Sequence, residues 1–158
     1  MMPILRWPHV ALRTKCDPVD LNDPELPGLI DEMHAIVKAS KGMALAANQL
    51  GVLKRLFVGY NRDATFINPR ITGYPAMGKT SYPEGCLSLP GYQEMVPRFI
   101  SVIVEYYDWT KKVVIVEERC GWAAVEFQHE LDHLDGIFFA ERARGGKDRA
   151  RAWLRSHR

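Results

Sequence analysis

The sequence His-Glu-x-x-His, which begins at His129 and ends at His133, is the feature that most constrains this chain. Residues four apart on an α-helix lie on the same face, so the two imidazoles would point the same way. Glu130 would place a carboxylate beside them. Two imidazoles and a neighbouring carboxylate are the groups that a hydrolytic metal site needs. The pattern therefore predicts a helix that carries a metal centre.

The residues around this pattern favour a helix. Gly121 precedes it, residues 122–134 contain neither Gly nor Pro, and Gly136 follows as a stop signal. A pattern this short also arises by chance, so a surface helix with two histidines is the alternative explanation. Further ligands elsewhere in the chain would decide between the two.

A second helix is predicted in the first third of the chain. Asn22-Asp23-Pro24 is a start signal, and apolar residues then recur at helical spacing to about Ser40. His34 is off the apolar stripe, so we expect it to be solvated. Residues 42–51 are rich in small side chains, and residues 44–47 are compatible with a helix or with a tightly packed loop.

Runs rich in β-branched and aromatic residues predict strands, and the runs at 101–107 and 112–118 form a predicted hairpin. An order of helix, strands and helix predicts an α+β fold with antiparallel pairing. The other predicted strands are 53–60 and 65–67, with a turn at 61–63 and breaks at 68–69 and 73–78.

Length and composition limit the class of protein. A chain of 158 residues predicts one domain, 1–158, with a core of its own. No apolar run reaches the length of a membrane span, and the first residues lack the pattern of a signal peptide. Three cysteines are an odd number, which favours free thiols or a metal ligand in a reducing compartment. We therefore expect a cytoplasmic location.

Basic residues are concentrated at the C-terminus. Seven Lys and Arg and a single acid, Asp148, give residues 142–158 a net charge of +6, which leaves −4 on the rest of a chain whose total is +2. Residues 147–158 resemble a short basic helix with Trp153 and Leu154 as its large apolar residues. The segment is either a solvated terminus or a binding element for an anionic partner.

Two further residues are candidates for the chemistry. Cys86 lies in the sequence EGCLSLPG at 84–91, which we interpret as a loop. A thiolate there would complete a set of two imidazoles and one sulfur, leaving a fourth position for water. Without the histidines, Cys86 would more often be a buried thiol. Gln49 is either a hydrogen-bonded core residue or a donor to a developing oxyanion.

Three stretches together resemble the peptide deformylase family: GMALAANQLG at 42–51, EGCLSLPG at 84–91 and QHELDHLDG at 128–136. The resemblance implies antiparallel β-sheets packed around a central helix that carries the His pair. It implies an enzyme that removes the formyl group from the N-terminal formyl-methionine of new polypeptides. The family uses one divalent metal ion, most often Fe(II), which Zn(II), Ni(II) or Co(II) can replace.

The resemblance also implies roles for individual residues. The metal ligands are Cys86, His129 and His133. Glu130 takes a proton from the metal-bound water that attacks the formyl carbon and then protonates the leaving amine. The oxyanion is held by the Gln49 amide and the Leu87 backbone N–H. The substrate-binding residues are Gly42, Met43, Ala44, Tyr82, Glu84, Gly85, Trp122, Val125 and Glu126.

Several residues depart from the family pattern. Ala44 stands where the first motif usually has Gly, and Gln93 where many bacterial members have Arg. Glu126 replaces a small or apolar residue, and we expect its carboxylate to point to the rim of the methionine pocket with only its stem lining the wall. The chain also ends earlier than many members, which continue in a longer C-terminal helix.

Two other classes of protein remain as alternatives. A zinc peptidase of the His-Glu-x-x-His type explains the helix but not residues 84–91. A nucleic-acid-binding module with a structural metal would need a fourth protein ligand, for which Cys16 and Cys120 are the candidates. For the deformylase, we expect formyl-Met nascent peptides as partners, a weak ribosome contact through the basic segment, no membrane, and a monomer.

Overall fold

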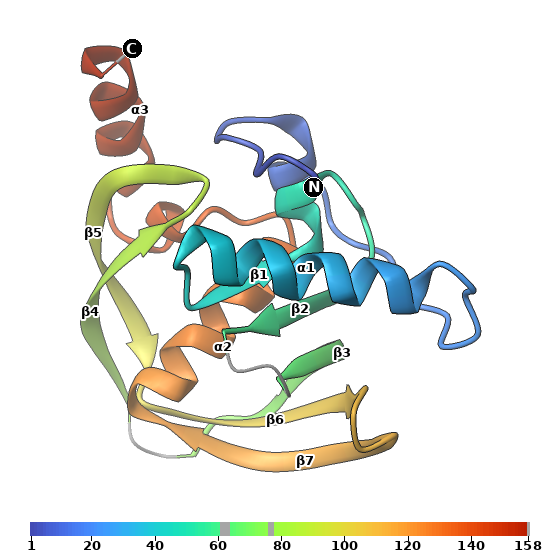
Figure 1. Ribbon diagram of the computed structural model, residues 1–158. Helices are drawn as coiled ribbons and strands as arrows, with labels where there is room; N and C mark the ends of the chain where they lie inside the picture. The colour runs from blue at the N-terminus through green and yellow to red at the C-terminus, as the bar shows by residue number, and fades with distance from the viewer. Residues whose placement is uncertain (61–63, 76–77, 158) are drawn as a thin grey trace.

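The computed structural model describes residues 1–60, 64–75 and 78–157 (Figure 1). The predicted turn at 61–63 lies outside these residues, as does part of the break at 73–78. The helices are η1 (Val10–Arg13), α1 (Leu26–Ser40), η2 (Ala47–Leu50), α2 (Gly121–Leu134), η3 (Phe139–Arg142) and α3 (Gly146–Ser156). The strands are β1 (Ala44–Ala46), β2 (Leu56–Gly59), β3 (Thr65–Gly73), β4 (Lys79–Cys86), β5 (Leu89–Phe99), β6 (Ser101–Asp108) and β7 (Val113–Cys120).

Two antiparallel sheets surround α2. The larger sheet has the strand order β1-β2-β3-β6-β7, and β4 pairs with β5 in a separate hairpin. Alternation along β2 explains how two helices use one sheet: Leu56 and Val58 pack in the cluster with α1, whereas Phe57 packs in the cluster with α2. Figure 1 shows α1 in front of this sheet and α2 behind it. The predicted α+β fold around a central helix is confirmed.

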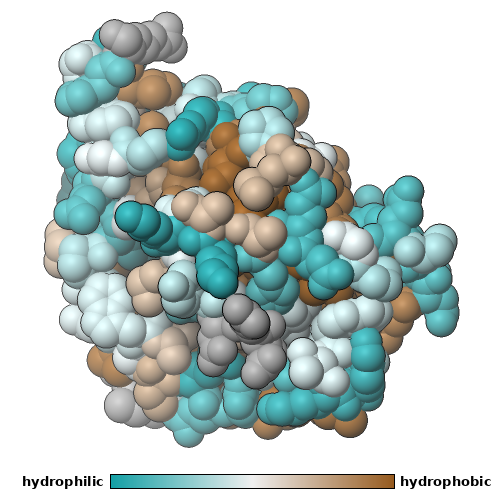
Figure 2. Space-filling model, viewed as in Figure 1, coloured by the Kyte–Doolittle hydropathy of each residue, from teal (hydrophilic) through white to brown (hydrophobic). Residues whose placement is uncertain are grey.

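Apolar and hydrophilic residues occupy different parts of the face seen in Figure 1. Figure 2 shows apolar residues gathered near the middle of this face, above α1, and hydrophilic residues over the outer end of α1. In the described part of the chain, no helix combines the length and the apolar character that a membrane span needs.

The first helix begins later than its start signal suggested. The Asp23 side chain accepts from the Glu25 N–H at 2.9 Å, so the signal forms a turn before α1, which starts at Leu26. His34 was expected to be solvated, and this was wrong. Its Nε2 lies 2.8 Å from the hydroxyl of Thr65, because this side of α1 faces the start of β3.

The small-residue segment forms a strand rather than a helix. Residues 44–46 are β1, and a short 3-10 helix, η2, begins at Ala47. β1 has the sequence Ala44-Leu45-Ala46, and all three residues are buried because the strand contacts both β2 and α2. The helical interpretation of 44–47 was wrong because tertiary packing determines this segment.

Two predicted irregular segments are strands. The break at 68–69 is a bulge within β3, where Asn68 has φ 50°. The Asn68 side-chain amide accepts a hydrogen bond from the Val19 N–H and donates one to the Val19 carbonyl. The segment 84–91 is not a loop, because residues 84–86 end β4 and residues 89–91 begin β5. The hairpin predicted at 101–118 is confirmed as β6 and β7.

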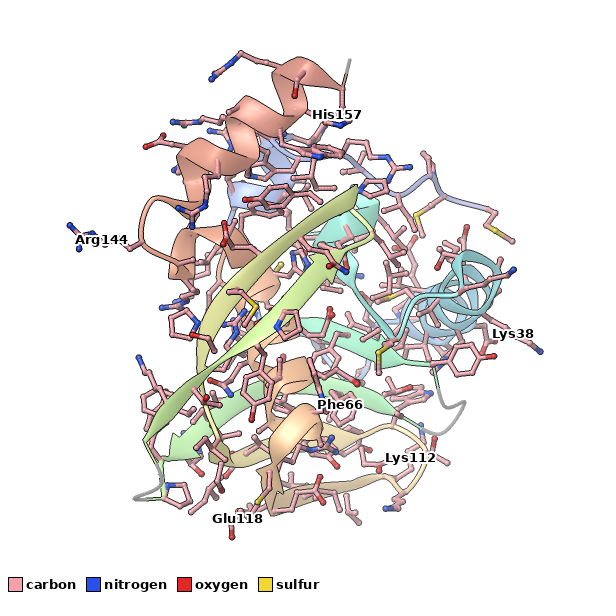
Figure 3. The ribbon with its side chains drawn as sticks, turned by 90° about the vertical axis from the view of Figure 1, so that its left-hand side faces the viewer. Lys38, Phe66, Lys112, Glu118, Arg144 and His157 are labelled. Atoms are coloured by element: carbon pink, nitrogen blue, oxygen red, sulfur yellow. The ribbon has the colours of Figure 1, made fainter. Side chains whose placement is uncertain are left out.

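The basic C-terminal segment is a helix, as predicted, but it is partly integrated into the fold. Ala150 of α3 is fully buried, and the ring of Trp153 contacts Tyr92 of β5 with centroids 5.8 Å apart. Arg142 forms an ion pair with Asp132 of α2, so it is not part of a free tail. Figure 3 shows α3 above the β4–β5 hairpin, with Arg144 pointing away from the body.

Candidate active site

The residues predicted as metal ligands converge from two elements. Cys86 is the last residue of β4, and His129 and His133 lie one turn apart on the buried side of α2. Their ligand atoms all lie within 4.8 Å of one another. The Cys86 sulfur is 3.3 Å from Nε2 of His133. In the described residues, neither Cys16 nor Cys120 joins this cluster, so the four-ligand structural site gains no support.

Glu84 orients the first histidine. Its Oε1 lies 2.6 Å from Nδ1 of His129, which leaves Nε2 of that ring for the cluster. Carboxylates bound in this way fix the tautomer and increase the basicity of a metal-ligating histidine. Glu84 was predicted to bind substrate, and it does line the cavity. Its carboxylate, however, forms a hydrogen bond with His129.

Arg98 holds Glu84 in place, and sequence reasoning missed it. Its Nε and one terminal nitrogen donate to the two oxygens of Glu84 at 2.7 and 3.0 Å, and the other nitrogen binds Asp132 of α2. Both partners and Arg98 are buried. Arg98 lies on β5, a strand that the sequence analysis did not predict, so no local signal connected it with α2.

We expect Arg98→Met to lower the free energy of unfolding by about 3–5 kcal/mol, because two buried carboxylates would lose their partner. Denaturant titration measures this change. Arg70→Met is the matched control, since Arg70 pairs with Glu105 at an exposed position and should cost at most about 1 kcal/mol. Equal losses for the two variants would contradict a structural role for the buried pair.

Glu130 lies beside the cluster, and its carboxyl group has a raised pKa. Burial raises its pKa to about 7. Its Oε2 has no hydrogen-bond partner among the described residues. Burial also holds the pKa of His133 well below its usual range, so this ring is neutral, as a metal ligand must be. A carboxyl group with a pKa near neutrality can both accept and return a proton.

Gln49 faces the cluster from η2. Its Oε1 accepts from the Ala46 N–H at 2.9 Å, which fixes the orientation of the amide. Its Nε2 donates to Ser88 at 3.1 Å and lies 3.6 Å from the Cys86 sulfur. Leu87 follows Cys86 directly in the chain. The arrangement places amide donors beside the predicted metal ligands.

A cavity of about 370 Å³ opens onto these groups, a size typical of small-molecule sites. Of the predicted substrate-binding residues, only Tyr82 does not line it. Tyr82 packs against Trp122, with ring centroids 5.0 Å apart. The sequence analysis did not predict Lys41, Pro83 and Pro90, which also line the cavity. The other lining residues are Gly42, Met43, Ala44, Gln49, Glu84, Gly85, Cys86, Leu87, Trp122, Val125, Glu126, His129 and Glu130.

Glu126 lies at the boundary between this cavity and an adjoining groove, which it lines together with Arg119. Its side chain is half-buried, and burial raises the pKa of its carboxyl. Gln93, which also departs from the family pattern, pairs with Gly85 across the β4–β5 hairpin.

The donor set fits a divalent metal ion. Two imidazole nitrogens and one sulfur face a common point, the carboxylate of Glu84 supports one ring, and a cavity gives access. Imidazole and thiolate ligands suit Fe(II) and Zn(II) and are a poor choice for Mg²⁺ or Ca²⁺. Three protein ligands with an accessible remaining position are typical of catalytic rather than structural sites.

Comparison with known proteins agrees with this geometry. The model of the polypeptide deformylase family matches residues 1–149. This chain belongs to the polypeptide deformylase family. A peptide deformylase of Heliobacterium modesticaldum is 40% identical over 141 residues, which cover 88% of this chain and 91% of that protein. The chain is therefore an enzyme that deformylates nascent peptides.

Solved deformylase structures share the fold. That of Legionella pneumophila superposes with a TM-score of 0.88 at 31% identity, covering 99% of this chain and 95% of that one. A class I type b deformylase of Acinetobacter baumannii with Met-Ala-Ser bound gives a TM-score of 0.79 at 29% identity, covering 89% of this chain and 97% of that one. Both confirm the predicted deformylase-like architecture.

Proposed function

We propose that this deformylase is metal-dependent and that Glu130 is its general base and acid. The observation that carries the proposal is the position of Glu130: its buried carboxyl lines the same cavity as Cys86 and His129, two of the three convergent ligand side chains. The substrate is the N-terminal formyl-methionine of a newly made polypeptide, and the product is the free amine with formate.

Cys86, His129 and His133 would hold the ion, with Fe(II) as the first choice and Zn(II), Ni(II) or Co(II) as substitutes. A divalent ion held there supplies Lewis-acid chemistry, because it polarises a carbonyl oxygen and lowers the pKa of water. Glu84 and Arg98 would keep the His129 ring in the orientation that this binding needs.

The protein's own groups account for the proton transfers. Glu130 takes a proton from the attacking water and later gives it to the leaving amine, a sequence that a carboxyl with a pKa near 7 can perform. The Gln49 side-chain amide and the Leu87 backbone N–H would donate to the oxyanion that forms on the formyl group. The oxygen of the Gln49 amide is bound to Ala46, so the NH₂ group is the end that faces the site.

The substrate's methionine would enter the apolar part of the cavity. Met43, Trp122 and Val125 offer surfaces suited to a thioether. Tyr82 would act indirectly by supporting Trp122. Every one of these side chains comes from a single copy of residues 1–158, so we infer that the monomer is a complete catalytic unit. We also infer that it works in the cytoplasm, where formylated chains emerge.

One experiment distinguishes deformylation from the peptide-bond cleavage expected of a zinc peptidase. Enzyme prepared without oxygen should release formate from formyl-Met-Ala-Ser, leave Met-Ala-Ser intact, and contain about one metal ion per chain. Chelation should abolish turnover, and Fe(II) should restore it. Cleavage of peptide bonds without formate release would favour the zinc peptidase instead. Turnover that persists in metal-free protein would contradict metal dependence.

Gln49→Ala is expected to lower kcat/KM by about 10²-fold if the amide donates to the oxyanion. Formate release measures the change, and metal analysis should show an unchanged ion. Ser88→Ala is the matched control, because it removes the other partner of the Gln49 Nε2 and leaves the donor in place. Unchanged kinetics for Gln49→Ala would reduce Gln49 to a core residue.

We propose that α3 gives the enzyme a weak ribosome contact. Its exposed Arg151 and Arg155, with Arg144 before the helix, form a basic surface that would attract phosphate. Replacing all three by Glu should weaken ribosome co-sedimentation at low salt by at least about tenfold and leave formyl-Met-Ala-Ser turnover unchanged. Truncation is a poorer test, since Trp153 and Ala150 are packed. Unaltered co-sedimentation of the triple variant would exclude this surface.

A further inference from the structure

The N-terminal arm, which we define as residues 4–7, contacts two distant segments of the candidate active site. The Leu5 N–H donates to the Gln49 carbonyl at 2.7 Å, and the Trp7 N–H donates to the Ser88 carbonyl at 2.9 Å. Gln49 belongs to η2, whereas Ser88 lies in the two-residue turn between β4 and β5. The arm, drawn in dark blue in Figure 1, therefore connects segments that are 39 residues apart in the sequence.

Arg6 adds a side-chain contact to the same turn. Its Nη1 donates to the Leu87 carbonyl at 2.5 Å. This carbonyl belongs to the Leu87–Ser88 peptide group, whose other polar group is the Ser88 N–H. Because this peptide group is planar and trans, its carbonyl and its N–H point in opposite directions. The contact that holds the carbonyl toward Arg6 therefore directs the Ser88 N–H away from the arm.

The Ser88 N–H is directed at the sulfur of Cys86. The distance from the Ser88 nitrogen to Sγ is 3.4 Å. The side-chain amide of Gln49 is a second donor, because its Nε2 lies 3.6 Å from the same sulfur. Hydrogen bonds to a ligand atom orient it and adjust how strongly it donates to a metal ion. The turn between β4 and β5 thus determines the surroundings of the Cys86 sulfur.

The parts of the turn on either side of this peptide group are held by other contacts. A Cβ at Gly42 would lie 2.5 Å from Cδ1 of Leu87, so the Leu87 side chain rests directly on the Gly42 backbone. The Ser88 carbonyl is held by the Trp7 N–H. The Leu87–Ser88 peptide group lies between these two anchors, and Arg6 is the side chain that binds its carbonyl.

We propose that Arg6 is a positioning residue for the metal site, because through the Leu87–Ser88 peptide group it aims the Ser88 N–H at the Cys86 sulfur. The inference rests on the proposed role of Cys86 as a metal ligand. A guanidinium on the carbonyl also polarises the peptide group, which makes its N–H a stronger donor. Arg6 is exposed and lies outside the cavity lining given above, so it acts without touching the substrate.

The hydrogen bond should favour turnover. A sulfur that shares its electron density with an N–H gives less of it to a metal ion, and the ion then remains a stronger Lewis acid. Loss of Arg6 should therefore lower kcat more than it changes KM.

Arg6→Met removes the donor and keeps a long side chain. In metal-free protein, NMR should show the Ser88 N–H exchanging with solvent at least about threefold faster, because one hydrogen bond of ordinary strength is weakened. In the cobalt-loaded protein, the sulfur-to-cobalt charge-transfer band should move to longer wavelength, because the sulfur donates charge more readily. The kcat for formyl-Met-Ala-Ser should fall by about tenfold, as for other groups that support a metal ligand.

Two further variants separate positioning from a general effect of the substitution. Arg6 binds the carbonyl through a single nitrogen, so the ammonium of Arg6→Lys can replace it and should restore the exchange rate, the band and kcat. Arg13→Met is the matched control, because Arg13 is an exposed arginine of η1 in the same part of the chain. It should change none of the three quantities.

Natural exchange of the Ser88 N–H in Arg6→Met would overturn the proposal. Faster exchange with an unmoved cobalt band would also overturn it, because Arg6 would then hold the turn without affecting the sulfur. A natural chain whose bound cobalt shows no sulfur charge-transfer band would contradict Cys86 as a ligand, and the inference would fail with the proposed function. Exchange at Ser88, measured without metal, distinguishes these two failures.

Discussion

Replacing Glu130 by Gln is expected to lower kcat/KM for formyl-Met-Ala-Ser by about 10³-fold, within the range that general acid–base groups contribute. The amide has nearly the same shape as the carboxyl but cannot take a proton from water. The metal content should stay unchanged, because the three ligand side chains remain. Formate release and metal analysis on the same sample measure both quantities. Full loss of the metal would mean that Glu130 acts on the ion instead of on the water.

Glu126→Gln is the matched control, because Glu126 is the other acid of α2 that lines the cavity. Its effect on kcat/KM should stay within about tenfold, far below the range of a general base. Natural enzyme should lose activity as the pH falls below the pKa of Glu130, since the protonated carboxyl cannot accept a proton. The residual activity of Glu130→Gln should lack that acid limb.

Cys86→Ala is expected to lower metal affinity by more than about 10²-fold and to abolish turnover at limiting metal. Loss of a supporting group around a ligand already costs 10- to 100-fold, and loss of the ligand itself should exceed that. Equilibrium dialysis against Zn(II) or Co(II) measures the affinity without depending on activity. Cys120→Ala is the control, because this exposed cysteine lies outside the cluster. Unchanged affinity in Cys86→Ala would remove Cys86 from the ligand set.

The sequence by itself determined the parts of the site whose geometry is local. The spacing of His129 and His133 fixes both imidazoles on one face of α2, because the helical repeat alone sets their positions. The two long helices and the β6–β7 hairpin follow in the same way from short-range apolar patterns and turn residues. The three motifs that carry the family resemblance also identified Cys86, Gln49 and most of the cavity wall.

Only the tertiary structure decided the contacts that join distant segments. The β4–β5 hairpin brings Arg98 to Glu84 and Asp132, and these partners come from a strand and a helix that no local pattern connects. Packing between β2 and α2 makes a strand of Ala44, Leu45 and Ala46, although their composition is compatible with a helix. Tyr82 turns to Trp122 instead of the cavity. In each case long-range packing determines the outcome, because propensity over a few residues is weaker than burial against another element.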